Sequence, residues 1–228
     1  MDMQQTTDFV PVIAIDGPSA SGKGTVAQRV ADHLGFHYLD SGALYRLVAV
    51  AAAQRQVALD QEPALAEIAR DLPGAFVGDA ILLNGEDVSA EVRSEATGGN
   101  ASKVAAFPLV REALLQRQRD FRQGPGLVAD GRDMGAVVFP DASLKVFLTA
   151  SAEVRAQRRC KQLIEKGLMA KGQGDIFTQI LQDIVERDQR DASRPVAPLK
   201  CYPDARMVDT TDLSIDQAVN QIIQFYSC

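Results

Sequence analysis

Cysteine and long apolar runs are scarce in this sequence, and each scarcity excludes a class of protein. The three cysteines, Cys160, Cys201 and Cys228, are far apart and form no C-x-x-C pair, so we expect neither a zinc site nor a disulfide framework. No run of 18 apolar residues occurs and no charged-then-apolar leader opens the chain, so membrane insertion and secretion both lack a signal. We therefore expect a cytoplasmic protein without a membrane partner.

Positive charge is also in short supply. A net charge of −6 argues against the broad basic surface that nucleic acids and anionic membranes require. Of the 24 basic residues 17 are arginine, the side chain best suited to bidentate capture of phosphate or carboxylate. We expect no nucleic-acid partner, and any polyanion must meet a local arginine-rich site.

Short apolar runs alternate with segments of helical periodicity along most of the 228 residues. The run VPVIAID (10–16) predicts a buried strand, after which Val26, Val30 and Leu34 form a helical stripe that Gly35 ends. This alternation indicates an α/β fold with a parallel sheet and helices on both faces. Further strands are expected at YLD, LVAD, LKVFLT and RMVDTT, and helices at 107–122, 152–166, 175–191 and 214–226, the last capped by Ser214.

Two segments interrupt this rhythm. A helix from Pro63 is followed by short strands around Asn84-Gly85, a strong tight-turn signal. We interpret residues 63–102 as a small α+β insertion in a core made of 9–62 and 103–228. The segment 165–175 has four charges flanking three glycines between two helices, and with the helix before it (155–175 in all) we interpret it as a lid within the core.

A glycine-rich stretch follows the first predicted strand. Gly17, Gly22 and Lys23 fit G-x-x-x-x-G-K between a strand and a helix, the context of a phosphate-binding loop, although a simple glycine-rich turn is the alternative. Backbone N–H groups would face an anion there, and Lys23 would supply a point charge to the β and γ phosphates. Because Gly24 rather than Ser or Thr follows Lys23, the ligands of any metal stay open. The predicted nucleotide-binding stretch comprises Gly17, Pro18, Ser19, Ala20, Ser21, Gly22, Lys23, Gly24 and Thr25.

The arginines indicate what receives the phosphate. A hydroxyl kinase usually needs a carboxylate base and a hydrolase must orient water. A kinase whose acceptor is itself a phosphate needs only cations that hold two polyanions together. Each arginine cluster alone is typical of a solvated helix face, but two clusters on either side of a lid favour this third chemistry. The clusters are Arg155, Arg158 and Arg159 (i, i+3, i+4) and Arg187, Asp191 and Arg194 (i, i+4, i+7).

Polar residues also follow two predicted strands, where parallel sheets bind ligands. Ser41 comes directly after the second strand and Arg46 lies one helical turn later, although Ser41 could merely cap its helix. Asp130, Arg132 and Asp133 follow the strand LVAD, where a charged surface turn is the alternative. Asp130 could also serve a magnesium ion, directly or through water.

Five stretches together, GPSASGKGT, DSGALYR, VAAFPLVR, DGRDMGAVVFP and ERDQRDASRPVAPL, resemble the bacterial cytidylate kinase family. The resemblance runs from about Val10 to the C-terminal helix. It implies a P-loop NTPase core with a five-stranded parallel sheet, an insertion that binds the nucleoside monophosphate, and a lid that closes over ATP. The implied reaction is in-line phosphorylation of CMP and dCMP to CDP and dCDP by a monomer, from ATP with Mg²⁺ and without a protein base.

The resemblance also implies roles for single residues. For the base these agree with chemistry, since cytosine offers an N4 amino donor beside two acceptors, whereas uracil would turn its O4 acceptor toward the carboxylate of Asp133. Implied ligands of the CMP phosphate and its surroundings are Ser41, Arg46, Arg132 and Arg187; those of cytosine are Ser102, Arg111 and Asp133, and that of the ribose is Asp191. Asp130 is counted with the substrate site. The arginines implied for the ATP phosphates are Arg155, Arg158, Arg159 and Arg194, and the expected catalytic set is Lys23, Arg132, Arg155, Arg159, Arg187 and Arg194.

Some residues depart from the family pattern, and two other functions stay open. Ala20 stands where the family often has glycine, and Gly98 and Gly99 fall in an expected helix at a cost of about 1 kcal/mol each, which would loosen the approach to Ser102. One alternative is a different acceptor, such as UMP, shikimate or pantoate; Arg111 and the DGRD stretch argue against it. The other is a nucleotide-dependent switch without chemistry, which would not need arginines in four separate motifs.

Overall fold

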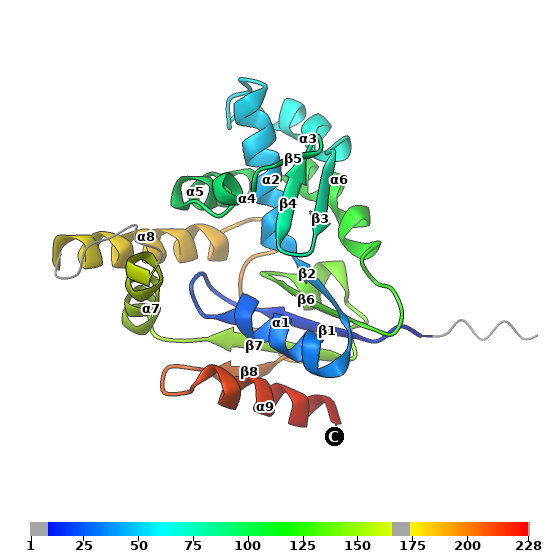
Figure 1. Cartoon of the computed structure of the whole chain (residues 1–228), viewed down its shortest axis with the longest axis vertical. Helices are drawn as coiled ribbons and strands as arrows, with labels where there is room; N and C mark the ends of the chain where they lie inside the picture. Colours follow the sequence, from blue (N-terminus) through cyan, green and yellow to red (C-terminus); the bar gives the residue numbers. More distant parts are fainter. Residues whose placement is uncertain (1–8, 166–173, 228) are drawn as a thin grey trace, which may run out of the picture.

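A computed structural model describes residues 9–165 and 174–227. Its centre is a five-stranded parallel sheet in the order β2-β6-β1-β7-β8 (Figure 1). The five-stranded parallel core expected from the sequence is thereby confirmed. The strands are β1 (Val12–Asp16), β2 (His37–Asp40), β6 (Leu127–Gly131), β7 (Leu144–Thr149) and β8 (Arg206–Asp209).

Every residue of β1 is buried, because apolar clusters cover both faces of the sheet. Ile13 and Ile15 belong to the cluster beneath α1 (Lys23–Leu34) and α9 (Ile215–Ser227). Val12 and Ala14 belong to the cluster on the other face. A strand covered on both sides reads as a continuous apolar run, which is why the first strand could be recognised without alternation.

On the second face, α2 (Ser41–Gln54) packs against β6, and α3 (Glu62–Arg70) packs against α2 and α6 (Pro108–Arg119). A three-stranded antiparallel sheet and two short helices extend beyond them, as Figure 1 shows. The Asn84-Gly85 turn joins two strands as predicted, with φ of 53° and 84°, and Leu83 beside it belongs to the same apolar cluster as Val12. These elements are β3 (Gly74–Val77), β4 (Ala80–Leu83), β5 (Glu86–Asp87), α4 (Ser89–Val92) and α5 (Glu95–Val104).

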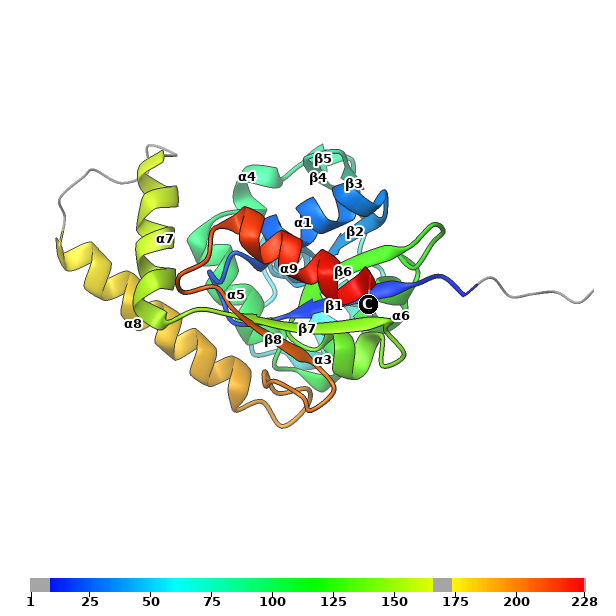
Figure 2. The ribbon, with the colours of Figure 1, turned by 90° about the horizontal axis from the view of Figure 1, so that it is seen from below.

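Two helices, α7 (Ala152–Glu165) and α8 (Gly174–Ala192), pack together at the carboxyl ends of the strands (Figures 1 and 2). Residues 166–173, the glycine-rich part of the expected lid, lie outside the described residues. α8 ends at Ala192, so the expectation that Arg194 continues the helical face of Arg187 is wrong. Within the described ranges, no helix is both long and apolar enough to cross a membrane.

Candidate active site

The loop between β1 and α1 owes its shape to residues without room for a side chain or with a left-handed backbone. A Cβ on Gly17 would lie 2.0 Å from the backbone oxygen of Leu148 in β7, so only glycine fits there. Gly22 caps α1 at φ 86°, and Ala20 adopts φ 55°, a conformation that costs a residue with a Cβ about 1–2 kcal/mol. Lys23 opens the helix and donates from Nζ to Pro18 O at 3.3 Å, across the loop.

Buried cations surround this loop. Burial, with smaller effects of Arg132 and Arg187, lowers the pKa of Lys23 to about 7, and Asp130 opposes this change. Burial and the nearby Arg132 likewise lower the pKa of Arg187 to about 10. Groups that repel one another in this way are stabilised by a bound polyanion, which is the ligand expected at a phosphate-binding loop.

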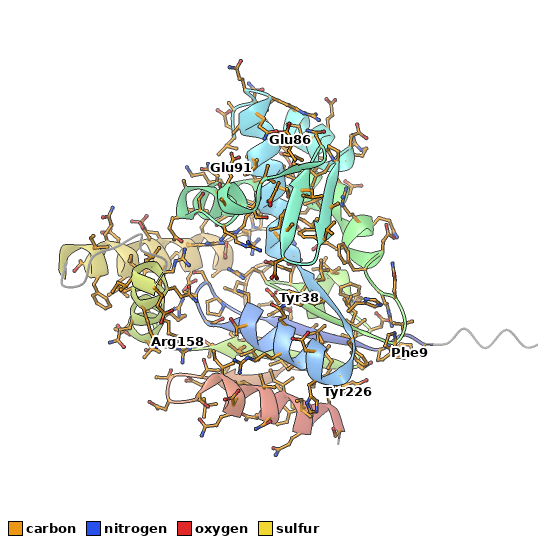
Figure 3. The ribbon with its side chains drawn as sticks, in the orientation of Figure 1. Phe9, Tyr38, Glu86, Glu91, Arg158 and Tyr226 are labelled. Atoms are coloured by element: carbon orange, nitrogen blue, oxygen red, sulfur yellow. The ribbon has the colours of Figure 1, made fainter. Side chains whose placement is uncertain are left out.

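The carboxyl end of β6 brings an acid next to Lys23. Tyr38 on β2 donates from Oη to Asp130 Oδ2 at 2.5 Å (Tyr38 is labelled in Figure 3). Burial raises the pKa of Asp130 to about 6, with Asp40 adding to the rise and Lys23 opposing it. Of the two carboxylates that raise the pKa of Lys23, Asp130 has the larger effect and Asp40 the smaller.

Ser41 does not cap α2, which was the alternative to a binding role for this residue. Asp40, not Ser41, caps the helix, since its Oδ1 accepts from the Ala43 backbone nitrogen at 3.1 Å. Ser41 is the first helical residue and is buried, and its Oγ would lie 2.5 Å from a Cβ on Gly131. The hydroxyl of Ser41 is thus placed against the end of β6 and is not used as a cap.

Asp191 joins three elements around the turn that follows β6. Its Oδ2 accepts from Arg132 Nε at 2.9 Å and its Oδ1 accepts from Ser102 Oγ of α5 at 3.0 Å. Burial alone would raise the pKa of Asp191, but Arg132, Arg194 and Arg187 together lower it. The structure thus brings together Ser102, Arg132 and Asp191, which the resemblance assigns to one substrate.

Arg111 and Asp133 form a buried ion pair beside this cluster. Arg111 Nη2 donates to Asp133 Oδ2, and the guanidinium carbon lies 5.8 Å from the centre of the Tyr45 ring. Burial raises the pKa of Asp133, although Arg111 opposes the rise. Arg111 Nε is buried and has no hydrogen-bond partner among the described residues, so a polar ligand here would satisfy a donor that the protein does not.

Arg194 lies with this pair and not with the phosphate loop. Its Nε donates to the backbone oxygen of Asp191 at 3.1 Å. Burial lowers the pKa of Arg194 and the nearby Arg111 adds to this, whereas Asp191 and Asp133 oppose it. Its buried Nη2 has no partner among the described residues. The expectation grouped Arg194 with the ATP arginines; because the chain turns back after Ala192, the structure places it on the other side of the site.

The three arginines of α7 do not share one environment. Arg155 donates to backbone oxygens of Ala150 and Ser19, and Arg158 (labelled in Figure 3) donates to Thr210 and, at 3.4 Å, to Ser21 O. Both arginines therefore bind backbone oxygens of the phosphate loop. Arg159 pairs instead with Glu95 of α5 across the site.

Two hollows meet at Arg46 and Arg159. One, of about 420 Å³, lies between the phosphate loop, α5, α7 and α8. The other, of about 830 Å³, lies between β2, α1 and the β3–β4 hairpin. Both arginines line both spaces, so the cationic groups stand where the two hollows join. The smaller hollow is also lined by Ser19, Ala20, Arg187 and Arg190.

α5 forms a helix despite its two glycines, and one of them has a local reason. Arg46 Nη1 donates to Val92 O at 2.7 Å and to Ser94 O at 3.1 Å, which draws its guanidinium against α5. A Cβ on Gly98 would lie 2.8 Å from Arg46 Nη2 and 3.3 Å from Arg187 Nη1, whereas one on Gly99 would meet nothing within 4 Å. Gly98 therefore leaves room for two arginines, which its helix propensity alone did not reveal.

Sequence reasoning missed two further carboxylates. Asp16, directly before Gly17, accepts from the backbone nitrogens of Met134 and Gly135 at 2.8 and 2.9 Å, and burial raises its pKa to about 7. It fixes the one-turn π-helix Met134–Val138 that follows Asp133. An acid at the end of a fully apolar strand was the available signal. Asp188, between Arg187 and the exposed Gln189, gave no such signal, yet it contacts the loop.

Comparison of the sequence with known families and proteins identifies one family. The family model described as Cytidylate kinase matches residues 13–227. The cytidylate kinase of Chromobacterium violaceum is 62% identical over 217 residues, covering 95% of this chain and 96% of the relative. That of Bordetella pertussis is 56% identical over 216 residues, covering 95% of each. Among solved structures, shikimate kinase from Bacteroides thetaiotaomicron aligns with 96% of this chain and 99% of its own at 15% identity, with a TM-score of 0.43.

Proposed function

The chain belongs to the cytidylate kinase family, and we propose that it transfers the terminal phosphoryl group of ATP to CMP or dCMP, giving CDP or dCDP. As a family member it is a kinase that phosphorylates CMP; the donor, the use of dCMP and the residue roles are our proposal. We propose that it acts in the cytoplasm as a monomer. The observation that carries the proposal is the set of buried, mutually repelling cations around the loop that begins at Gly17.

The cations divide between the two nucleotides. Lys23 and the loop N–H groups bind the donor phosphates, and Arg159 reaches the same space from α7. Arg46, Arg132 and Arg187, with Ser41, hold the acceptor phosphate. Because the attacking oxygen is already anionic, the side chains need only align the two polyanions and neutralise the transferring group.

The buried pair of Arg111 and Asp133 reads the base. The carboxylate accepts from the N4 amino group of cytosine, and the free donors of Arg111 and Arg194 face its acceptors. Asp191, held by Ser102 and Arg132, meets the ribose. Uracil would place O4 against Asp133, and two acceptors facing each other in a buried site are strongly unfavourable.

We propose that Mg²⁺ binds here together with the nucleotide phosphates and not at a site made by the protein alone. Within the parts of the chain that the structure describes, no three His, Cys, Asp or Glu side chains come together as a metal site. A Mg²⁺ that arrives with phosphates needs only one or two carboxylates and waters, and Asp130 beside Lys23 is the carboxylate placed to serve it. When bound, the ion would neutralise part of the negative charge on the donor phosphates.

The test is ADP release from ATP and Mg²⁺ with CMP, with dCMP and without acceptor. Release that depends on CMP and on dCMP is the expected result. ATP binding without acceptor-dependent release would favour the switch that the sequence left open, and release with shikimate or pantoate but not CMP would favour a different acceptor.

A further inference from the structure

Asp188 on α8 lies between the phosphate loop and α7. Its Oδ1 accepts from the hydroxyl of Ser19 at 3.2 Å and from the Ser19 backbone nitrogen at 3.4 Å. Its Oδ2 accepts from Arg155 Nη1 at 2.5 Å. Arg155 Nη1 also donates to the Ser19 backbone oxygen at 3.1 Å, so the three residues close a ring, called here the Ser19–Asp188–Arg155 brace.

The brace fixes a segment of the phosphate loop whose backbone conformation is unfavourable by itself. Ser19 precedes Ala20, whose left-handed backbone is strained for a residue with a Cβ, and such strain persists only where surrounding contacts fix it. Ser19 is bound on both its N–H and its C=O by groups from α7 and α8. The brace is therefore what fixes the loop at the position where its backbone is least favourable.

Charge explains why the middle member must be an acid. The Arg155 side chain is only 8% exposed, and its other bonds go to neutral backbone oxygens of Ala150 and Ser19. Among the described residues Asp188 is the only carboxylate that pairs with it. Removing one partner of a largely buried pair leaves the other charge without compensation, so Arg155 would be expected to leave its position.

We infer that Asp188 is a positioning residue for the donor phosphates, acting through Arg155 and Ser19 on the phosphate loop. The inference rests on the proposed function, in which ATP binds that loop. It also gives Arg155 a different part from the direct phosphate contact that the resemblance implies. The acceptor side is reached by other residues of α8, so the effect of Asp188 should fall on ATP and not on CMP.

The test compares Asp188→Asn with Glu153→Gln. Asparagine keeps an oxygen for Ser19 but removes the charge that holds Arg155. Glu153 lies on α7, the helix that carries Arg155, is exposed and takes no part in the brace, so its variant controls for the loss of one charge. We expect Asp188→Asn to raise the KM and the calorimetric Kd for ATP about tenfold and to leave the KM for CMP within about twofold. Glu153→Gln should match the wild type in both.

A double-mutant cycle with Arg155→Lys separates action through Arg155 from a merely structural role. If Asp188 acts through Arg155, the double variant should bind ATP no more weakly than the weaker single variant. Additive losses, or equal losses for ATP and CMP, would overturn the inference. If Asp188→Asn does not fold, judged by circular dichroism, Arg155→Lys alone decides, because it must weaken ATP and spare CMP.

The wild type separates this inference from the proposed function. A wild-type protein that neither binds ATP nor turns over CMP would refute the proposed function itself. A wild type that does both, beside an Asp188→Asn variant with unchanged ATP affinity, would refute the role of Asp188 alone.

Discussion

Arg132 donates from Nε to Asp191 Oδ2 at 2.9 Å, and this bond ties the turn after β6 to α8. The same helix carries Asp188, which contacts the phosphate loop, and Arg187, whose guanidinium lies near Arg132. A single helix, α8, therefore contacts both the proposed donor side and the proposed acceptor side. Small displacements of α8 would misalign the two phosphates, and alignment is what this chemistry requires of the protein.

Arg132→Ala tests the acceptor side of that connection. Removing a preorganised cation from the transferring phosphoryl group should lower kcat about 100- to 1000-fold. Calorimetric ATP affinity should stay within about twofold, because Lys23 and the loop N–H groups, and not Arg132, are the proposed ligands of the donor phosphates. Arg29→Ala is the control, since Arg29 forms an exposed pair with Asp216, lines neither hollow and should change neither value. Normal turnover in Arg132→Ala would reject the assigned role.

Gly98→Ala and Gly99→Ala form a matched pair on α5. Both remove a helix glycine and should raise the free energy of unfolding by about 0.5–1 kcal/mol. Only the methyl group of Gly98→Ala meets Arg46 and Arg187. Because it meets the ends of flexible side chains, the two guanidinium groups can move aside, and the gain in the free energy of unfolding is kept. We expect the KM for CMP to rise several-fold in Gly98→Ala alone, measured with thermal unfolding alongside. Equal KM values in the two variants would show that Gly98 does not set the arginine positions.

Lys23 should make ATP binding depend on pH. Its pKa of about 7 in the free protein reflects burial and the facing cations Arg132 and Arg187, opposed by Asp130 and Asp40. Bound phosphates favour the charged lysine, so binding should take up a proton above pH 7 and affinity should fall as pH rises from 7 to 9. Asp130, with a pKa of about 6, titrates below this window.

Titration calorimetry at pH 8 in buffers of different ionisation enthalpy measures that proton. Lys23→Arg is the control, because arginine stays charged and should bind ATP without proton uptake. A wild type that takes up no proton at pH 8 would show that Lys23 is already charged before ATP binds.

Local patterns in the sequence carried most of the fold. β1 could be predicted because both its faces are covered, and Gly17 and Gly22 because the loop's backbone geometry restricts those positions directly. Lys23 was found from its place directly after Gly22 in the motif. The residues of the site were found by resemblance and by their places after strands. Their partners were not, because a pairing such as Asp191 with Ser102 joins α8 to α5 across 89 positions.

The failures have physical causes. Asp40 caps α2 in place of Ser41 because either residue could serve and only the backbone decides. Arg194 was assigned by continuing a helical period that the chain abandons after Ala192. Asp188 was not identified from the sequence, because nothing local shows that its carboxylate reaches Ser19. The sequence showed only the helix-propensity cost of Gly98, because its contacts with Arg46 and Arg187 depend on the tertiary structure.

The most direct test of the account is the ratio of kcat/KM for CMP to that for UMP, with ATP and Mg²⁺. A site that hydrogen-bonds N4 of cytosine through Asp133, itself held by Arg111, should favour CMP by about 100-fold or more, with dCMP close to CMP. Equal values for CMP and UMP would contradict the reading of the base by this pair.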